Sequence, residues 1–135
     1  MLWYLEPWRY AGRRPMAGAI EGLRLLDSQF DWAILSARSE AARGLTQAWL
    51  SRHLDVRPTV YLRRDWRETP AAFKARMAVQ LGVAAHFEDD AVTAAWLAEL
   101  IPAVFLVDWR RNRWLSAPGV HRIRRIAEAV AHLPG

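Results

Sequence analysis

The sequence predicts a three-layer, Rossmann-like α/β domain in which helices cover both faces of a parallel sheet of about five short strands. Apolar runs of four or five residues alternate along the chain with segments of helical length, which is typical of βαβ units. The hydrophobic share of 53% and the charged share of 24% are those of an ordinary globular protein. The length of 135 residues fits one domain, residues 1–135.

The strands are expected at residues 2–5, 32–35, 59–62, 83–87 and 103–107. The helices are expected at residues 15–28, 40–54, 70–81, 91–100 and 120–132. Proline suits the first turn of a helix, so Pro15 and Pro70 mark two helix starts, while Gly82 is expected to end the helix that Pro70 begins. Pro7 ends the first strand.

Composition excludes several classes of protein. With no cysteine, the chain has neither a disulfide framework nor a thiolate metal site. No apolar run reaches the length of a membrane span, and the first ten residues contain no apolar signal core, so we expect no membrane association and a cytoplasmic location. The net charge of +5 favours anionic partners. Lys74 is the only lysine among nineteen basic residues.

Polar residues follow successive strands, where ligands of parallel sheets bind. Ser36 follows the second strand, Lys74 lies in the helix after the third, and Asp89 and Asp90 follow the fourth. A hydroxyl and a lysine can bind phosphate, and paired acids can hold Mg²⁺. Each also has an ordinary structural explanation: Ser36 and the acids could cap helices, and Lys74 could be a solvated helix residue.

This order resembles the second, third and fourth motifs of the haloacid dehalogenase superfamily. Further similarity is to the 3′-phosphatase domains of bacteriophage polynucleotide kinases, which show a Ser-Gly-Arg strand end, a Thr-x-x-Trp-like helix segment and an Asp-x-Arg before the lysine. The counterparts are Ser36–Arg38, Thr46–Trp49 and Asp65–Arg67. The resemblance covers about residues 15–108, with the basic segment 109–135 expected to pack on it. It implies phosphate binding by Ser36, Arg38, Arg67 and Lys74 and metal binding by Asp89 and Asp90, so the cofactor is Mg²⁺ or none. Asp65 and Arg67 could instead form a loop ion pair.

The chain departs from the family at the first motif. There the family has Asp-x-Asp, whose first aspartate is the nucleophile, whereas the strand at 2–5 is followed by Glu6-Pro7-Trp8. Glu6 is one methylene too long, and a misplaced nucleophile costs about a hundredfold in rate. We therefore expect at most remnant catalytic roles for Ser36, Lys74 and Glu6. A start upstream of Met1 that restores the motif is an alternative.

Two basic groups contain tryptophan or tyrosine and are candidates for partner binding. The first is Arg9, Arg13 and Arg14, among Trp3, Tyr4, Trp8 and Tyr10. The second is Trp109, Arg110, Arg111, Arg113 and Trp114, followed by Arg122, Arg124 and Arg125. Arginine beside exposed aromatic rings suits nucleic acid and also suits a protein interface, while a solvated basic surface is the third interpretation.

Two functions remain open. The first is a catalytically inactive binding or regulatory module that uses these basic and aromatic loops. The phage-like resemblance makes a host nucleic-acid machine such as RNA polymerase one candidate target. The second is an Mg²⁺-dependent phosphatase acting on nucleic-acid 3′-phosphates or nucleotide phosphates.

Overall fold

The computed structural model describes residues 19–133, and helices alternate with strands along this part of the chain. The helices are α1 (Ala19–Gln29), α2 (Arg43–His53), α3 (Pro70–Leu81), α4 (Ala91–Ala98) and α5 (Ile126–Val130). The strands are β1 (Ala33–Ser39), β2 (Thr59–Arg63), β3 (Ala85–Glu88), β4 (Ala103–Val107) and β5 (Val120–Ile123). Two short 3₁₀ helices, η1 (Glu40–Ala42) and η2 (Arg110–Asn112), follow β1 and β4.

All pairing between the described strands is parallel, which confirms the predicted fold class. β1 pairs with β2 in one sheet, and β3, β4 and β5 form a second sheet with β4 in the middle. The strands are therefore divided between two sheets, where a single sheet was predicted. The strand expected at residues 2–5 lies outside the described residues.

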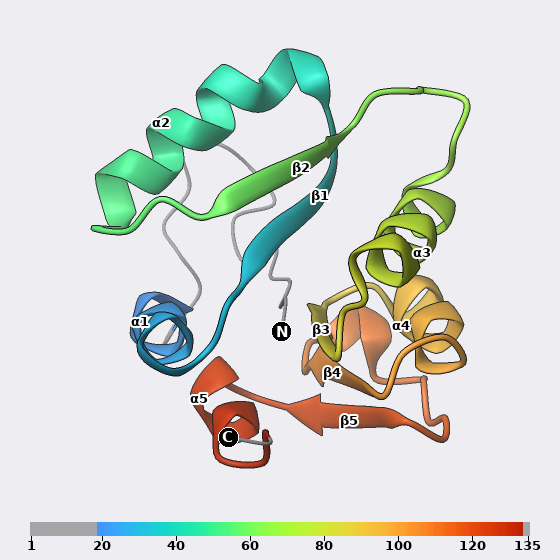
Figure 1. Ribbon diagram of the computed structural model, residues 1–135. Coiled ribbons are helices and arrows are strands. Elements are labelled where there is room, and N and C mark those ends of the chain that lie inside the picture. Colours follow the sequence, from blue (N-terminus) through green and yellow to red (C-terminus); the bar gives the residue numbers. More distant parts are fainter. Residues whose placement is uncertain (1–18, 134–135) are drawn as a thin grey trace.

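Helices lie on both sides of the sheets, which gives the layered arrangement of an α/β domain (Figure 1). α2 lies along the β1–β2 sheet, α3 packs against α4 beside the three-stranded sheet, and α1 packs against α5 on the other side. α3 also contacts β1, so it connects the two sheets. Gly22 makes the packing of α1 on α5 possible, because a Cβ there would lie 2.5 Å from the Cβ of Ile126.

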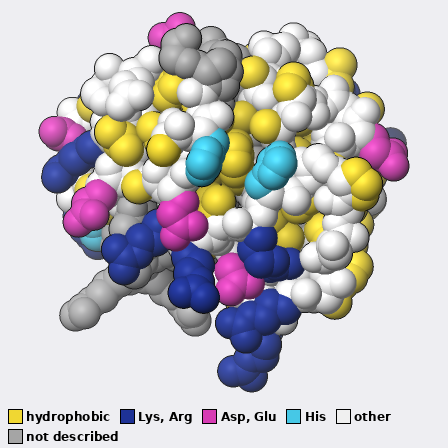
Figure 2. Space-filling view, turned by 90° about the horizontal axis from the view of Figure 1, so that it is seen from below, with side chains coloured by type: hydrophobic (Ala, Val, Ile, Leu, Met, Phe, Trp, Pro, Cys, Tyr) yellow, Lys and Arg dark blue, Asp and Glu magenta, His cyan; other side chains and the backbone are white. Residues whose placement is uncertain are grey.

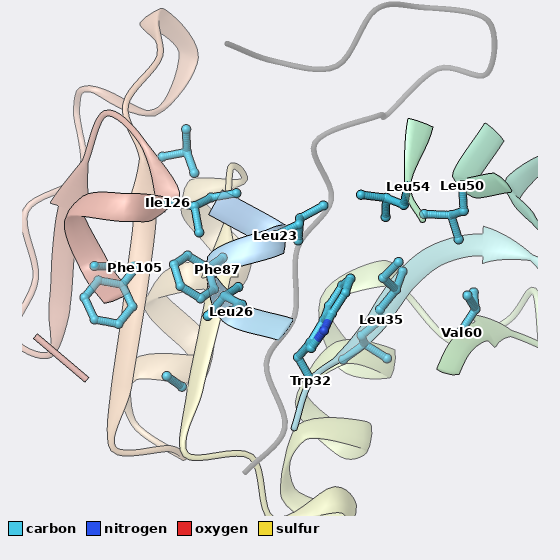
Figure 3. Packing of buried hydrophobic residues seen from close by; sticks show 14 of the residues in the cluster. Leu23, Leu26, Trp32, Leu35, Leu50, Leu54, Val60, Phe87, Phe105 and Ile126 are labelled. Atoms are coloured by element: carbon cyan, nitrogen blue, oxygen red, sulfur yellow. The ribbon is translucent and has the colours of Figure 1, made fainter. Parts of the chain in front are cut away.

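The main hydrophobic cluster includes residues of both sheets and of α1, α2 and α5. Leu26 and Phe87 lie on one side of the cluster in Figure 3 and Leu50 and Val60 on the other, with Trp32 between them. Trp32 satisfies its indole N–H by donating to Asp27 Oδ1 at 2.9 Å. This cluster spans both sheets and holds them together, and a second cluster lies between α3, α4 and β4.

Local signals explain why α3 and α4 begin and end where they do. The Thr69 side chain caps α3 by accepting from the N–H of Ala72, and Pro70 occupies the first turn. Gly82 ends α3 in the left-handed conformation, with φ of 65°. The Asp90 carboxylate caps α4 by accepting from the N–H of Thr93 at 3.0 Å.

The prediction of one helix over residues 120–132 was wrong at its start, because residues 120–123 form β5 and only residues 126–130 are α-helical. Val120 and Ile123 fit the spacing of a helix face, but they also fit a strand, and pairing with the edge of β4 decides between the two. The N–H of Asp108 extends this pairing by donating to the carbonyl of Ile123 at 2.7 Å. None of the helices between residues 19 and 133 is long and apolar enough to cross a bilayer.

Candidate functional site

The structure brings Lys74 of α3 and Glu88 at the end of β3 together as a buried ion pair. Lys74 Nζ lies 3.0 Å from Glu88 Oε1 and 3.3 Å from Oε2. The lysine is 3% exposed and the glutamate 2%. The lysine predicted to bind phosphate is therefore in the interior, with its charge compensated by a carboxylate that the site prediction did not include.

The Glu88 carboxylate is the centre of a larger polar cluster. Its Oε1 also lies 2.9 Å from Nε2 of the fully buried His86. Its Oε2 accepts the main-chain N–H groups of Asp89 and Asp90 at 3.1 and 3.2 Å. Both oxygens are surrounded by hydrogen-bond donors, so Glu88 fixes the turn after β3 and orients Lys74. These contacts use the lone pairs that metal coordination would require.

The two aspartates predicted to bind metal occupy the turn that Glu88 fixes. Oδ2 of Asp90 accepts from both the N–H and the hydroxyl of Thr93, at 3.0 and 2.8 Å, so the capping interpretation holds for this residue. Asp89 is half-buried. Across residues 19–133 no group of three histidine or acidic side chains is arranged to hold a metal ion. Metal binding by Asp89 and Asp90 stays a prediction.

The sequence predicts a strand that ends at residue 35 with Ser36 after it, but β1 runs to Ser39, so Ser36 and Arg38 lie within the strand. Ser36 is fully buried inside the strand, and its Oγ accepts the N–H of Arg38 at 3.3 Å. Ser36 is thus not the cap of the following helix, because the residue before η1 is Ser39. Arg38 is half-buried. Phosphate binding by Ser36 and Arg38 stays a prediction.

Arg67 lies in the exposed loop between β2 and α3. Its guanidinium stacks 5.5 Å from the ring centroid of Trp66, which is 79% exposed. The Asp65 carboxylate accepts the main-chain N–H of Arg67 at 2.9 Å, so the contact between these residues is a turn hydrogen bond and the expected loop ion pair is replaced by it.

The segment after β4 packs directly against the acidic turn. The indole N–H of Trp109 and the side-chain amide of Asn112 both donate to the carbonyl of Asp89, each at 2.9 Å. The same amide donates to the carbonyl of Val107 at 2.7 Å, and Asn112 is only 1% exposed. The loop predicted to bind a partner is therefore held rigidly beside the β3 end.

Arg122 of β5 holds the other side of this loop. Its guanidinium donates to Asn112 Oδ1 at 2.7 Å, to the carbonyls of Asn112 and Leu115 at 3.0 and 2.9 Å, and to Asp108 Oδ1 at 3.0 Å. Arg122 is thus a structural residue of the loop.

The remaining predicted partner-binding residues differ in exposure. Trp109 is half-buried, with the Arg111 guanidinium 5.2 Å from its ring centroid. Arg110, Arg111 and Arg113 are exposed, and Trp114 is 67% exposed. Glu6, Arg9, Arg13 and Arg14 lie outside the described residues.

Sequence reasoning missed Glu88, His86 and Asn112 as site residues. A signal for the first two was available, because positions 86 and 88 of a strand project to the same face and two buried polar residues there require partners. Asn112 carried no comparable signal, since its role depends on how the loop after β4 folds back.

A groove of about 700 Å³ lies on the face formed by β5 and α5. Its lining includes Phe105, His121, Ile123, Glu128, His132 and Leu133. Figure 2 shows histidine side chains beside hydrophobic surface on this face, with Lys and Arg side chains gathered along one edge. The groove contains none of the predicted phosphate- or metal-binding residues.

Comparison with known proteins supports the fold. No family model and no curated protein matches the chain. Among solved structures it is similar to the D,D-heptose 1.7-bisphosphate phosphatase from B. bronchiseptica, which was crystallised with magnesium and phosphate. The TM-score is 0.62 and the identity 12%, over 98% of this chain and 96% of that chain. The chain therefore has a haloacid dehalogenase-like fold.

Proposed function

We propose that this protein is a non-catalytic binding module on a haloacid dehalogenase-like scaffold, and that it engages a macromolecular partner through the loop after β4. The observation that carries the proposal is that the side chains which resemble the phosphatase motifs are engaged in contacts within the protein. Lys74 and Glu88 neutralise each other in the interior, and Asp90 caps α4. The loop after β4 instead presents its arginines and Trp114 to solvent.

The rigidity of this loop supports a binding role. Asn112 and Arg122 fix its backbone through hydrogen bonds to β4, β5 and the turn after β3. A partner that binds a fixed loop does not have to order it, so less conformational entropy is lost on association. Host RNA polymerase is one partner to examine, as the phage-like resemblance suggests.

A second candidate function is an Mg²⁺-dependent phosphatase acting on nucleic-acid or nucleotide phosphates. The observation that favours it is the likeness of fold to a phosphatase whose structure contains magnesium and phosphate. Asp89 and Asp90 would then bind the metal, and Lys74, oriented by Glu88, would face the phosphate.

Turnover distinguishes the two functions. The purified protein is incubated with magnesium and either an aryl phosphate or a 3′-phosphorylated oligonucleotide, and phosphate release is measured. We expect no release above background. Release that disappears in Asp89→Asn but persists in Asp31→Asn, an exposed aspartate outside the candidate site, would establish the phosphatase and overturn the binding proposal.

Recovery of a partner from cell lysate tests whether the loop after β4 is a binding surface. We expect a complex recovered from cell lysate at moderate salt to be lost in the double variant Arg110→Ala/Arg111→Ala. The double variant Arg52→Ala/Arg57→Ala removes two exposed arginines elsewhere and should leave the complex intact. Equal recovery with both variants would exclude the loop after β4 as the binding surface.

A further inference from the structure

The positive charge of this protein is concentrated in one short part of the chain. Residues 108–128 contain six arginines against Asp108 and Glu128, which gives a net charge of +4, because six minus two is four. Residues 19–107 contain ten basic and eleven acidic residues, for a net charge of −1. Residues 1–18 contain three arginines and one glutamate and so add +2, which completes the net charge of +5. Residues 19–107 are thus almost neutral, and the largest positive contribution comes from the segment that contains η2, β5 and the start of α5.

The fold places these arginines next to one another. β4 and β5 are adjacent parallel strands, with Val107 opposite Ile123, so the loops after them leave the sheet side by side. Arg122 then bridges the end of β5 to the loop after β4. We define the basic surface as the side chains of Arg110, Arg111, Arg113, Trp114, Arg124 and Arg125, all of which are exposed.

Four of these arginines are available to a ligand. Arg113 lies 3.6 Å from Asp108, but within residues 19–133 no carboxylate is at ion-pair distance from Arg110, Arg111, Arg124 or Arg125. Glu128 accepts the main-chain N–H of Arg124 at 3.1 Å and leaves its guanidinium unengaged by that contact. Each of these four guanidinium groups presents a planar set of donors that matches a phosphate group, including that of Arg111, which lies over the Trp109 ring.

We propose that the basic surface binds single-stranded nucleic acid, with the four arginines on the phosphates and Trp114 stacked on a base. This rests on the proposed binding function and names the class of its partner. The centres of protein–protein interfaces are depleted in charged residues, whereas the protein surfaces that bind nucleic acid are polar and strongly positive. The basic surface is of the second kind, because it consists of five exposed arginines and only one large apolar side chain, Trp114.

The test is fluorescence anisotropy of a labelled oligothymidylate, titrated with the protein at several salt concentrations. Single strands lose affinity with a slope of about −0.7 per phosphate contact on logarithmic axes. Four contacts therefore predict a slope of about −2.8, which is about a 50-fold loss of affinity between about 50 and 200 mM salt. Arg124→Ala/Arg125→Ala should weaken binding by about tenfold or more and reduce the slope to about −1.4.

Matched variants separate this surface from general attraction to a basic protein. Arg52→Ala/Arg57→Ala removes the same charge elsewhere and should leave the slope unchanged. Trp114→Ala should weaken binding by about tenfold through lost stacking, while Trp96→Ala, which also removes an exposed tryptophan, should have no effect.

Three results would overturn the proposal: no binding at about 50 mM salt, where phosphate contacts are strong; equal losses in the two arginine double variants; or equal affinity for polyglutamate of the same charge. The last result would assign the basic surface to an acidic protein partner. Since partner capture through Arg110 and Arg111 can succeed while oligonucleotide binding fails, failure of this inference is distinguishable from failure of the proposed function.

Discussion

Replacing Glu88 by glutamine removes one charge of the buried Lys74–Glu88 pair and keeps the shape of the side chain. The pair lies at 3.0 Å with side chains that are 4% and 0% exposed, so water can barely replace the lost carboxylate. Removing one partner of a buried ion pair costs about 3–5 kcal/mol, because the other charge stays buried without compensation. A protein of this size has a total stability of about 5–15 kcal/mol, so Glu88→Gln should remove a large fraction of it.

The assay is thermal and urea unfolding of the wild type, Glu88→Gln, Lys74→Met and the double variant. At about 4 °C per kcal/mol, each single variant should melt about 12–20 °C below the wild type. The double variant contains neither charge and should be more stable than either single variant. The coupling energy of the cycle should therefore be large and favourable.

Additivity would refute this reasoning. If the double variant loses the sum of the two single losses, Lys74 and Glu88 do not stabilise each other. Single losses below about 1 kcal/mol, the range of exposed pairs, would mean that the pair is solvated.

Three further predictions concern residues outside this pair. Gly22→Ala should destabilise the protein by about 1–3 kcal/mol in urea unfolding, since its Cβ would lie 2.5 Å from a side chain of α5. Gly44→Ala, whose Cβ would have nothing within 4 Å, should be neutral or stabilising. The opposite order of stability would contradict the packing of α1 on α5. The hydrogen bonds from Arg76 lower the pKa of Glu68 below its ordinary value. Glu68→Gln should therefore be less stable than the wild type above a pH of about 4.3, and this difference in unfolding free energy should vanish as the pH falls through the folded-state pKa. A difference that grows on acidification would contradict a lowered pKa. Asn112→Ala should cost about 2 kcal/mol or more, because the buried amide donates to the carbonyls of Asp89 and Val107 and its oxygen accepts from Arg122; the Asp89 carbonyl keeps only the Trp109 indole N–H. An unchanged urea midpoint would show that the loop after β4 is held by other contacts.

The sequence predicts the helices and strands best where local chemistry and packing agree. Pro70 and Gly82 bound α3 at the expected residues, and the strand over residues 103–107 is found as predicted. The helix expected over residues 120–132 failed because pairing with β4 is a long-range contact that spacing alone does not reveal.

The candidate site was only partly predictable, for a related reason. Lys74 and the acidic turn after β3 were identified from their order along the chain, but Glu88 was not identified as the partner of Lys74, because their contact joins α3 to the end of β3. The rigid loop after β4 depends on Asn112 and Arg122, whose hydrogen bonds join three separate segments. Such contacts follow from the folded chain and from no local pattern.

The most direct measurement of the central claim is an NMR titration of the ¹⁵N-labelled protein with a 3′-phosphorylated single-stranded oligonucleotide. The account predicts that the amide signals which shift belong to residues 109–114 and 122–125, on the basic surface. Shifts concentrated at residues 36–38 and 88–90, with the basic surface unchanged, would place the ligand in the phosphatase-like site and contradict the account.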